Sequence, residues 1–250
     1  MGLQRLAIAP HQLQNQQIIL NTQQQHYLNR VLRLKEGDRF IAMDGQGQWW
    51  LASLGASAAQ ARIIELLSVQ NELPVTVTLM VALPKGNGFD EVVRQMTELG
   101  VVCIAPTISD RTLLNPSPQK LERWRRIAGE AAEQSERQIV PTILDPVPFA
   151  TSLSLINTQQ SFTKNKQYIC VARGESPHFL NCLNDLRQMT PDKEQINIVI
   201  ATGPEGGWTP KEVESAIAAD FQPVSLGRRI LRAVTAPLVA LSLVAAAWEQ

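Results

Sequence analysis

Residues Ile196–Ala216 read INIVIATGPEGGWTPKEVESA and decide the fold class of this chain. The apolar and largely β-branched run at 196–201 predicts a strand that is buried on both faces. The next segment, 202–207, holds three glycines and a proline, which predicts a sharp turn. Thr209 and Glu212 have the spacing of a capping box and predict that a helix follows at once. Buried strand, glycine turn and capped helix together indicate an α/β domain.

In open α/β sheets, ligands bind at the carboxyl ends of strands, where backbone without Cβ atoms allows close approach. We expect Gly206 to be such a point, with a positive φ. The turn lacks the Gly-Lys-Ser/Thr of a phosphate-binding loop and the Gly-x-Gly-x-x-Gly spacing of a dinucleotide site. Taken alone, it is as consistent with a purely structural turn as with a binding loop.

A second stretch, SLGRRILRAVTA at 225–236, shifts that balance toward a binding loop. Together the two stretches resemble the RsmE family, the 16S ribosomal RNA uridine N3-methyltransferases of the SPOUT superfamily. That family pairs Gly-Pro-Glu-Gly-Gly with a later Leu-Gly-x-Arg-Ile-Leu-Arg-x-Glu-Thr-Ala. Val234 stands where the family usually has glutamate. The blocks at 94–101 and 123–135 also resemble the family, so the resemblance covers most of the chain.

The resemblance implies a fold of two parts. A small β-rich PUA-like RNA-binding domain would occupy 1–72, and a SPOUT methyltransferase α/β domain with a C-terminal trefoil knot would occupy 73–250. The polar segment at 71–74 is the expected linker. The family resemblance further implies a homodimer with the cofactor site near the subunit interface.

The implied reaction is methyl transfer from S-adenosyl-L-methionine to N3 of a uridine in 16S ribosomal RNA of the small ribosomal subunit. The sulfonium makes the methyl group electrophilic, so no metal is expected. Arg232 is the candidate catalytic residue, because a cation can stabilise charge that develops on the uridine carbonyl oxygens, or grip a target phosphate. No general base is evident from spacing. The expected cofactor-binding residues are Thr202, Gly203, Pro204, Glu205, Gly206, Leu226, Gly227, Ile230 and Leu231.

Two roles stay open for several of these residues. Glu205 could hold the glycine turn through hydrogen bonds to backbone rather than act on a ligand. Arg232 could brace its loop by pairing with a carboxylate. The expected RNA contacts are basic residues of the first domain and of a helix that begins near Ser117, and a solvated basic surface is the alternative for each of them: Arg5, Arg30, Arg33, Arg123 and Arg126.

Composition limits the remaining possibilities. Lys and Arg together number 23, as do Asp and Glu, so any nucleic-acid contact must come from a local basic patch. The three cysteines lack metal-ligand spacing and suit a reducing cytoplasm. The start of the chain lacks the pattern of a signal peptide, and the apolar segment 236–248 is too short to span a bilayer. We therefore expect a cytoplasmic protein without metal or membrane contact.

Other segments give weaker predictions. The glutamine-rich stretch 12–25 suggests a solvated loop, 138–144 a strand, and 151–166 a polar excursion. The helix expected at 237–248 is apolar nearly all round, so it should be buried, either in its own domain or at a subunit interface.

Two rival functions stay open. The chain could be a non-catalytic RNA-binding or ribosome assembly protein on a SPOUT scaffold, which the valine at 234 favours and the intact glycines oppose. It could also be a SPOUT methyltransferase with another RNA target.

Overall fold

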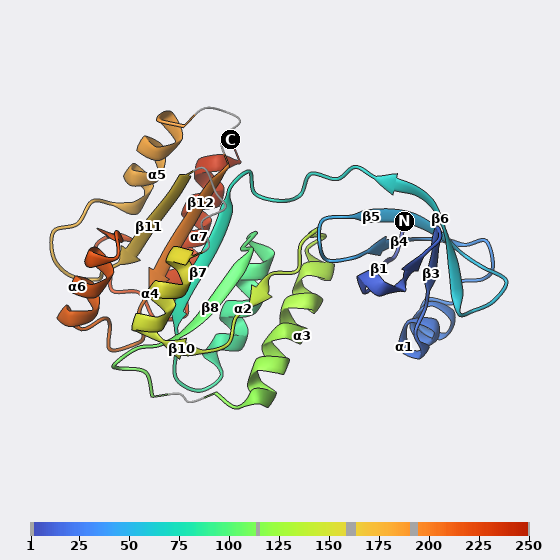
Figure 1. Ribbon diagram of the computed structural model, residues 1–250, viewed down its shortest axis with the longest axis horizontal. Helices are drawn as coiled ribbons and strands as arrows, with labels where there is room; N and C mark the ends of the chain where they lie inside the picture. The colour runs from blue at the N-terminus through green and yellow to red at the C-terminus, as the bar shows by residue number, and fades with distance from the viewer. Residues whose placement is uncertain (1–2, 114–115, 159–163, 191–194, 250) are drawn as a thin grey trace. The chain divides into compact units, whose positions relative to one another are not determined.

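The computed structural model describes residues 3–113, 116–158, 164–190 and 195–249. The chain divides into two compact units (Figure 1). The first combines Met1–Glu72 with Ala132–Val140, and the second combines Leu73–Ala131 with Pro141–Gln250.

The first unit is built on a six-stranded sheet with the order β1-β4-β5-β6-β3-β2. All neighbouring strands are antiparallel except β1 and β4, which are parallel. The strands are β1 (Arg5–Ala7), β2 (Leu13–Gln14), β3 (Gln17–Ile19), β4 (Arg39–Met43), β5 (Trp49–Leu54) and β6 (Gln60–Leu67). Short helical turns complete the unit: η1 (Pro10–Gln12), α1 (Thr22–His26) and η2 (Tyr27–Val31).

One face of this sheet carries the core of the unit, which includes Phe40, Leu28 and Ile18. The prediction of a glutamine loop at 12–25 is wrong, because the segment contains β2, β3 and α1, and its solvated character holds only for the exposed glutamines Gln14, Gln16, Gln17 and Gln23. Gln12 is buried, and its amide donates to the carbonyl oxygen of Ile19 and to Oε1 of Gln24. Composition could not reveal this, because the amide is buried only where the fold brings it to its partners on β3 and α1.

A buried ion pair ties the later segment Ala132–Val140 into the first unit. The guanidinium of Arg137, whose side chain is only 2% exposed, donates from Nε to Oε2 of Glu72 over 3.1 Å. Oε1 of the same carboxylate accepts the backbone N–H groups of Gln138 and Ile139. One carboxylate thus satisfies a buried cation and two backbone donors.

The second unit is an α/β domain with a seven-stranded sheet. Its order is β10-β8-β7-β12-β11-β13, with β9 paired to β8, and all pairs are parallel. Figure 1 shows β8, β7, β12 and β11 side by side. The strands are β7 (Thr76–Ala82), β8 (Cys103–Ile108), β9 (Thr142–Ile143), β10 (Val147–Pro148), β11 (Lys164–Cys170), β12 (Ile196–Thr202) and β13 (Gln222–Val224). All of β12 is buried, as the apolar run predicted.

Helices cover both faces of this sheet. On one face, Phe149 of α4 and Ala216 of α6 pack on alternate strand residues such as Met80 and Val199. On the other face, α7 packs against α2, α5 and β12. The helices are α2 (Gly88–Glu98), α3 (Pro118–Gln134), α4 (Phe149–Thr158), α5 (Phe179–Gln188), α6 (Pro210–Ala218) and α7 (Thr235–Trp248).

Two predictions for the second unit are wrong. The segment expected to be a polar excursion contains α4, whose Phe149, Leu153 and Ile156 enter the core. Residues 159–163 of that prediction lie outside the described residues. The strand expected at 138–144 shrinks to β9, because 138–140 belongs to the first unit.

The last helix is buried by its own domain. Leu241 is fully buried, while Ser242 and Ala246 are exposed. Within the described residues, no helix is both long and apolar enough to cross a membrane. The trefoil knot stays a prediction.

Candidate active site: a pocket at the carboxyl ends of the parallel strands

A pocket of about 790 Å³ lies where β11, β12 and β13 end. Three loops line it: 170–176 after β11, the glycine turn 203–207 after β12, and 226–231 after β13. This is the edge of the sheet at which the strand–turn–helix pattern predicted a ligand. Its volume suits a small organic ligand of the size of a nucleoside cofactor.

The glycines of the turn are needed for different reasons. A Cβ on Gly203 would lie 3.3 Å from the ring of Trp208, which itself packs on Phe149 with ring centroids 4.8 Å apart. A Cβ on Gly206 would lie 3.0 Å from Cδ of Arg111. The expected positive φ at Gly206 is wrong, because the left-handed residue is Gly207, at φ 67°. Gly206 is required by close packing and not by its backbone angle.

The helix after the turn begins as the sequence predicted. The Thr209 hydroxyl accepts the N–H of Glu212, and the Glu212 carboxylate accepts the N–H of Thr209. The structure adds a contact that spacing could not show: Oε1 of Glu212 also accepts the N–H of Asp110, in the loop after β8. The cap therefore fixes two loops at once.

Glu205 accepts a backbone hydrogen bond that holds the turn, which is the first of the two roles expected for it. Its Oε1 accepts the N–H of Lys85, in the loop after β7, over 3.0 Å. On the same turn, Nη1 of Arg111 donates to the carbonyl oxygen of Gly206 over 2.5 Å. Loops from two neighbouring strands therefore support the glycine turn from outside.

The structure brings most of the expected cofactor residues together. Thr202 is the exception, because it is fully buried at the end of β12 and does not line the pocket. Ile230 lines the pocket but is 67% exposed, so it is available to contact a ligand. Eight of the expected residues line the pocket: Gly203, Pro204, Glu205, Gly206, Leu226, Gly227, Ile230 and Leu231.

Sequence reasoning missed one wall of the pocket. The loop 170–176 lines it because β11 lies beside β12, a neighbour relation that no local pattern reveals. Arg111 was also missed. Cys170 lines the pocket, but burial raises the pKa of its thiol to about 12. It is therefore protonated at neutral pH and not poised as a nucleophile.

Arg232 lies just outside this pocket. It is exposed and follows Leu231, which does line the pocket. No ion pair or side-chain hydrogen bond of Arg232 is found in the part of the chain that the structure describes, so a brace through a carboxylate gains no support. Val234 precedes α7 and packs at the start of α2, where its Cγ1 would lie 2.9 Å from a Cβ on Gly88.

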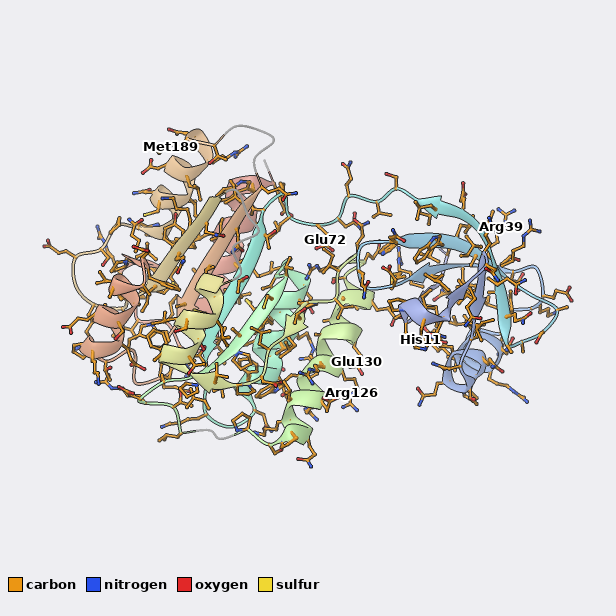
Figure 2. All side chains as sticks on the ribbon, in the orientation of Figure 1. His11, Arg39, Glu72, Arg126, Glu130 and Met189 are labelled. Carbon is orange, nitrogen blue, oxygen red and sulfur yellow. The ribbon has the colours of Figure 1, made fainter. Side chains whose placement is uncertain are left out.

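The five arginines expected to contact RNA differ in their surroundings. Arg5 pairs with Glu136 and lies over the Trp49 ring. On α3, Arg123 pairs with Asp90, and Arg126 with Glu130, labelled in Figure 2. Arg30 and Arg33, in contrast, are exposed, and among the described residues neither has an ion pair.

The sequence matches two family models. The model described as RNA methyltransferase domain covers residues 71–245, and that described as RNA methyltransferase PUA domain covers residues 20–64. Among curated proteins, the chain is 48% identical to ribosomal RNA small subunit methyltransferase E of Synechocystis sp., over 98% of this chain and 78% of that protein.

Solved structures show the same similarity. The chain resembles a ribosomal RNA small subunit methyltransferase E from Neisseria gonorrhoeae bound to S-adenosyl methionine, with TM-score 0.81, 30% identity and coverage of 99% and 98% of the two chains. It also resembles a putative methyltransferase from Legionella pneumophila in complex with the same cofactor, with TM-score 0.79, 26% identity and coverage of 99% and 98%.

Proposed function

We propose a function from one premise: the chain belongs to the family of RNA methyltransferases named ribosomal RNA small subunit methyltransferase E. It is an enzyme that transfers a methyl group from S-adenosylmethionine to RNA. Its substrate is 16S ribosomal RNA of the small ribosomal subunit, and the methylated atom is N3 of a uridine. The pocket at the carboxyl ends of the parallel strands is the observation that carries this proposal.

The residues around the pocket fit the cofactor. Glycines and small residues expose backbone donors and acceptors, and the apolar side chains of Leu226, Ile230 and Leu231 offer surface for an adenine ring. A Cβ on Gly203 would press on Trp208, which also lines the pocket, so the glycine lets the turn and this ring lie close together in the pocket wall. When bound, S-adenosylmethionine supplies an electrophilic methyl group on a sulfonium.

The protein's own contribution is mainly position. The turn 203–207 is held on one flank, through Glu205 to Lys85 and through Arg111 to Gly206, and it leads into the capping box of α6. Because the turn is already ordered, its ordering costs little free energy when a ligand binds. Thr202 is buried at the end of β12, directly before the turn.

Arg232 is the proposed catalytic residue. Loss of the N3 proton to solvent water leaves negative charge on the uridine ring, which spreads to its carbonyl oxygens. An exposed arginine without a carboxylate partner in the described part of the chain can be directed at that charge. The valine at 234 cannot ionise, so we assign no acid–base role to that position.

The first domain, residues 1–72, is proposed to hold the RNA and the second, 73–250, to carry the reaction. Arg30 and Arg33 are the better RNA candidates, because they are exposed and carry no ion pair in the described residues. Phosphate would have to displace a carboxylate at Arg5, Arg123 and Arg126.

We also propose a homodimer and a cytoplasmic location, where ribosomal RNA is found in bacteria. The half-buried residues of α7, such as Leu238 and Leu243, are the better positions at which to test the interface. Leu241→Glu would place a charge in the core of the domain, so it should unfold the chain and not merely split a dimer.

Two measurements test the proposal. Calorimetry should detect S-adenosylmethionine binding, and mass spectrometry of nucleosides should detect 3-methyluridine in 16S ribosomal RNA only when this protein is present. Binding of the cofactor with no methylated nucleoside on small-subunit particles or naked RNA would favour the non-catalytic rival. Methylation of a different RNA would contradict the proposed substrate.

A further inference from the structure

We infer that Lys85 and Arg111 bind RNA phosphates beside the target uridine and so position it over the cofactor pocket. Both residues lie on loops that touch the glycine turn from outside. The inference rests on the proposed function, because it assigns the RNA side of the same site.

The strand order separates two flanks of the glycine turn. Strand β12 lies between β7 and β11 (Figure 1). Loops after β11 and β13 therefore lie on one flank, where they line the pocket, and loops after β7 and β8 lie on the other. Lys85 follows β7 and Arg111 follows β8. The two cations therefore lie on the same flank of the turn, opposite the loops that follow β11 and β13.

Lys85 is fixed by its backbone and not by its charge. Its N–H donates to Oε1 of Glu205, which attaches the loop to the glycine turn. The ammonium group makes no ion pair or hydrogen bond within the ranges that the structure describes. Lys120, at the start of α3, adds a positive charge to the same loop, because its Nζ donates to the carbonyl oxygen of Gly86 over 3.3 Å.

Arg111 connects this flank to the pocket. Its stem covers Gly206, its Nη1 donates to the Gly206 carbonyl oxygen, and its side chain also lines the pocket. A guanidinium has five N–H donors in a planar fork. One contact to the turn leaves most of that fork for a phosphate, a ligand that it matches well.

The carboxylates on this flank are already engaged with the protein. Glu205 accepts the N–H of Lys85, and Glu212 accepts the N–H groups of Asp110 and Thr209. Asp110 itself lies 3.3 Å from the Thr209 hydroxyl. Because these acids bind backbone or hydroxyl groups, the cations beside them stay available to a polyanion. Two further acids, Glu175 and Glu214, belong to the pocket lining, Glu175 after β11 and Glu214 on α6.

Lys85→Gln is the decisive variant, because it removes the charge and keeps the backbone hydrogen bond to Glu205. For the full-length protein, we expect the dissociation constant for small-subunit ribosomal RNA to rise about fivefold, and the slope of its logarithm against log salt to fall by about one. Affinity for S-adenosylmethionine should stay within about twofold of wild type, as for a contact made only to RNA. Lys166→Gln, an exposed lysine at the amino end of β11, is the matched control and should change neither.

Arg111 gives a second, separable effect. Arg111→Gln should weaken RNA binding and also cofactor binding, because Gly206 loses its donor. Arg111→Lys should recover most of the salt dependence but less of the RNA affinity, since an ammonium cannot copy the planar fork.

The inference is overturned if Lys85→Gln binds RNA with the same affinity and salt slope as Lys166→Gln. RNA binding is measured without cofactor, so this result does not depend on turnover. A wild-type protein that binds RNA through Lys85 but neither binds S-adenosylmethionine nor methylates RNA would leave the inference standing and overturn the proposed function.

Discussion

The loops after β7 and β8, which carry Lys85 and Arg111 beside the glycine turn and are called the rim below, and helix α3 both carry basic residues, but the carboxylates near them have different partners. At the rim, Glu205 and Glu212 accept backbone N–H groups, which leaves the ammonium of Lys85 unpaired in the described structure. The arginines of α3, in contrast, pair directly with carboxylates: Arg123 with Asp90 of α2, and Arg126 with Glu130 of α3 itself. A cation is therefore more available to phosphate where the nearby carboxylates accept backbone N–H groups than where they pair with the cation itself.

Helix α3 illustrates the cost of that pairing. Arg125 contacts two carboxylates, Glu122 at 2.8 Å and Asp145 at 3.1 Å. Exposed pairs of this kind stabilise a protein by about 0 to 1 kcal/mol each. They add little stability, yet each one occupies guanidinium donors that a phosphate would otherwise bind. We therefore expect changes at the rim to have large effects and changes on α3 small ones.

The largest difference should come from Arg232. Arg232→Ala should lower turnover by roughly 100-fold or more, about 2.7 kcal/mol, because it removes charge stabilisation that is needed mainly in the transition state. Affinity for S-adenosylmethionine should barely change, and Arg232→Lys should rescue only in part. Single-turnover assays with calorimetry measure both quantities. A parallel loss of cofactor affinity and stability would indicate a loop brace.

Position 234 tests whether Arg232 supports methylation without the carboxylate that the family usually has there. The wild-type protein has no carboxylate at position 234. In single-turnover assays it should still methylate at least one of two substrates, small-subunit particles or naked RNA. If wild type is inert on both and Val234→Glu restores activity, Arg232 is not sufficient and the glutamate of the family is required.

Gly206→Val should have the next largest effect. The added side chain would press on Arg111, which lies 3.0 Å from the Cβ position, and should weaken S-adenosylmethionine binding about tenfold or more, about 1.4 kcal/mol, while the fold persists. The control is Gly129→Ala on α3, where a Cβ meets open space and should stabilise the helix by about 0.5–1 kcal/mol. Calorimetry and thermal unfolding distinguish the two. Unchanged affinity in Gly206→Val would exclude this turn from the site.

Glu205→Ala should have a moderate effect. It removes the acceptor for the Lys85 N–H, at a cost of about 1 kcal/mol, and should loosen the turn enough to weaken cofactor binding about fivefold. The matched change on α3 is Glu130→Ala, which breaks only an exposed pair 3.6 Å long and should alter neither binding nor stability measurably. Equal effects of the two variants would remove the distinction between the regions.

The smallest effect should come from Arg126→Ala. Its side chain is 68% exposed and paired with Glu130, so RNA affinity should stay within about twofold of wild type in a filter-binding assay. A loss as large as that of Lys85→Gln would show that phosphate displaces Glu130, and would restore α3 as an RNA-binding surface.

The sequence predicted several local features correctly and failed for others that depend on tertiary packing. Its blocks at 196–216 and 225–236 predicted the α/β class, the cap of α6, the methyltransferase function and the cofactor, and the comparisons confirm the family, the function and the cofactor. Such features depend on residues close together in the chain, whose spacing is visible in the sequence. The wrong predictions concern burial that spacing does not show: Gln12 is buried by hydrogen bonds to β3 and α1, and α4 by packing on strands far from it in the chain.

The sequence by itself therefore determined that a buried strand enters a glycine turn, that a capped helix leaves it, and which family these blocks belong to. Only the tertiary structure decided which loops stand beside that turn. The strand order places the loop of β11 against one side of the turn and the loops of β7 and β8 against the other. Cys170 therefore lines the pocket, while Lys85 and Arg111 form hydrogen bonds with the turn. Neighbours in a parallel sheet are set by crossover connections and long-range packing, and no local spacing encodes them.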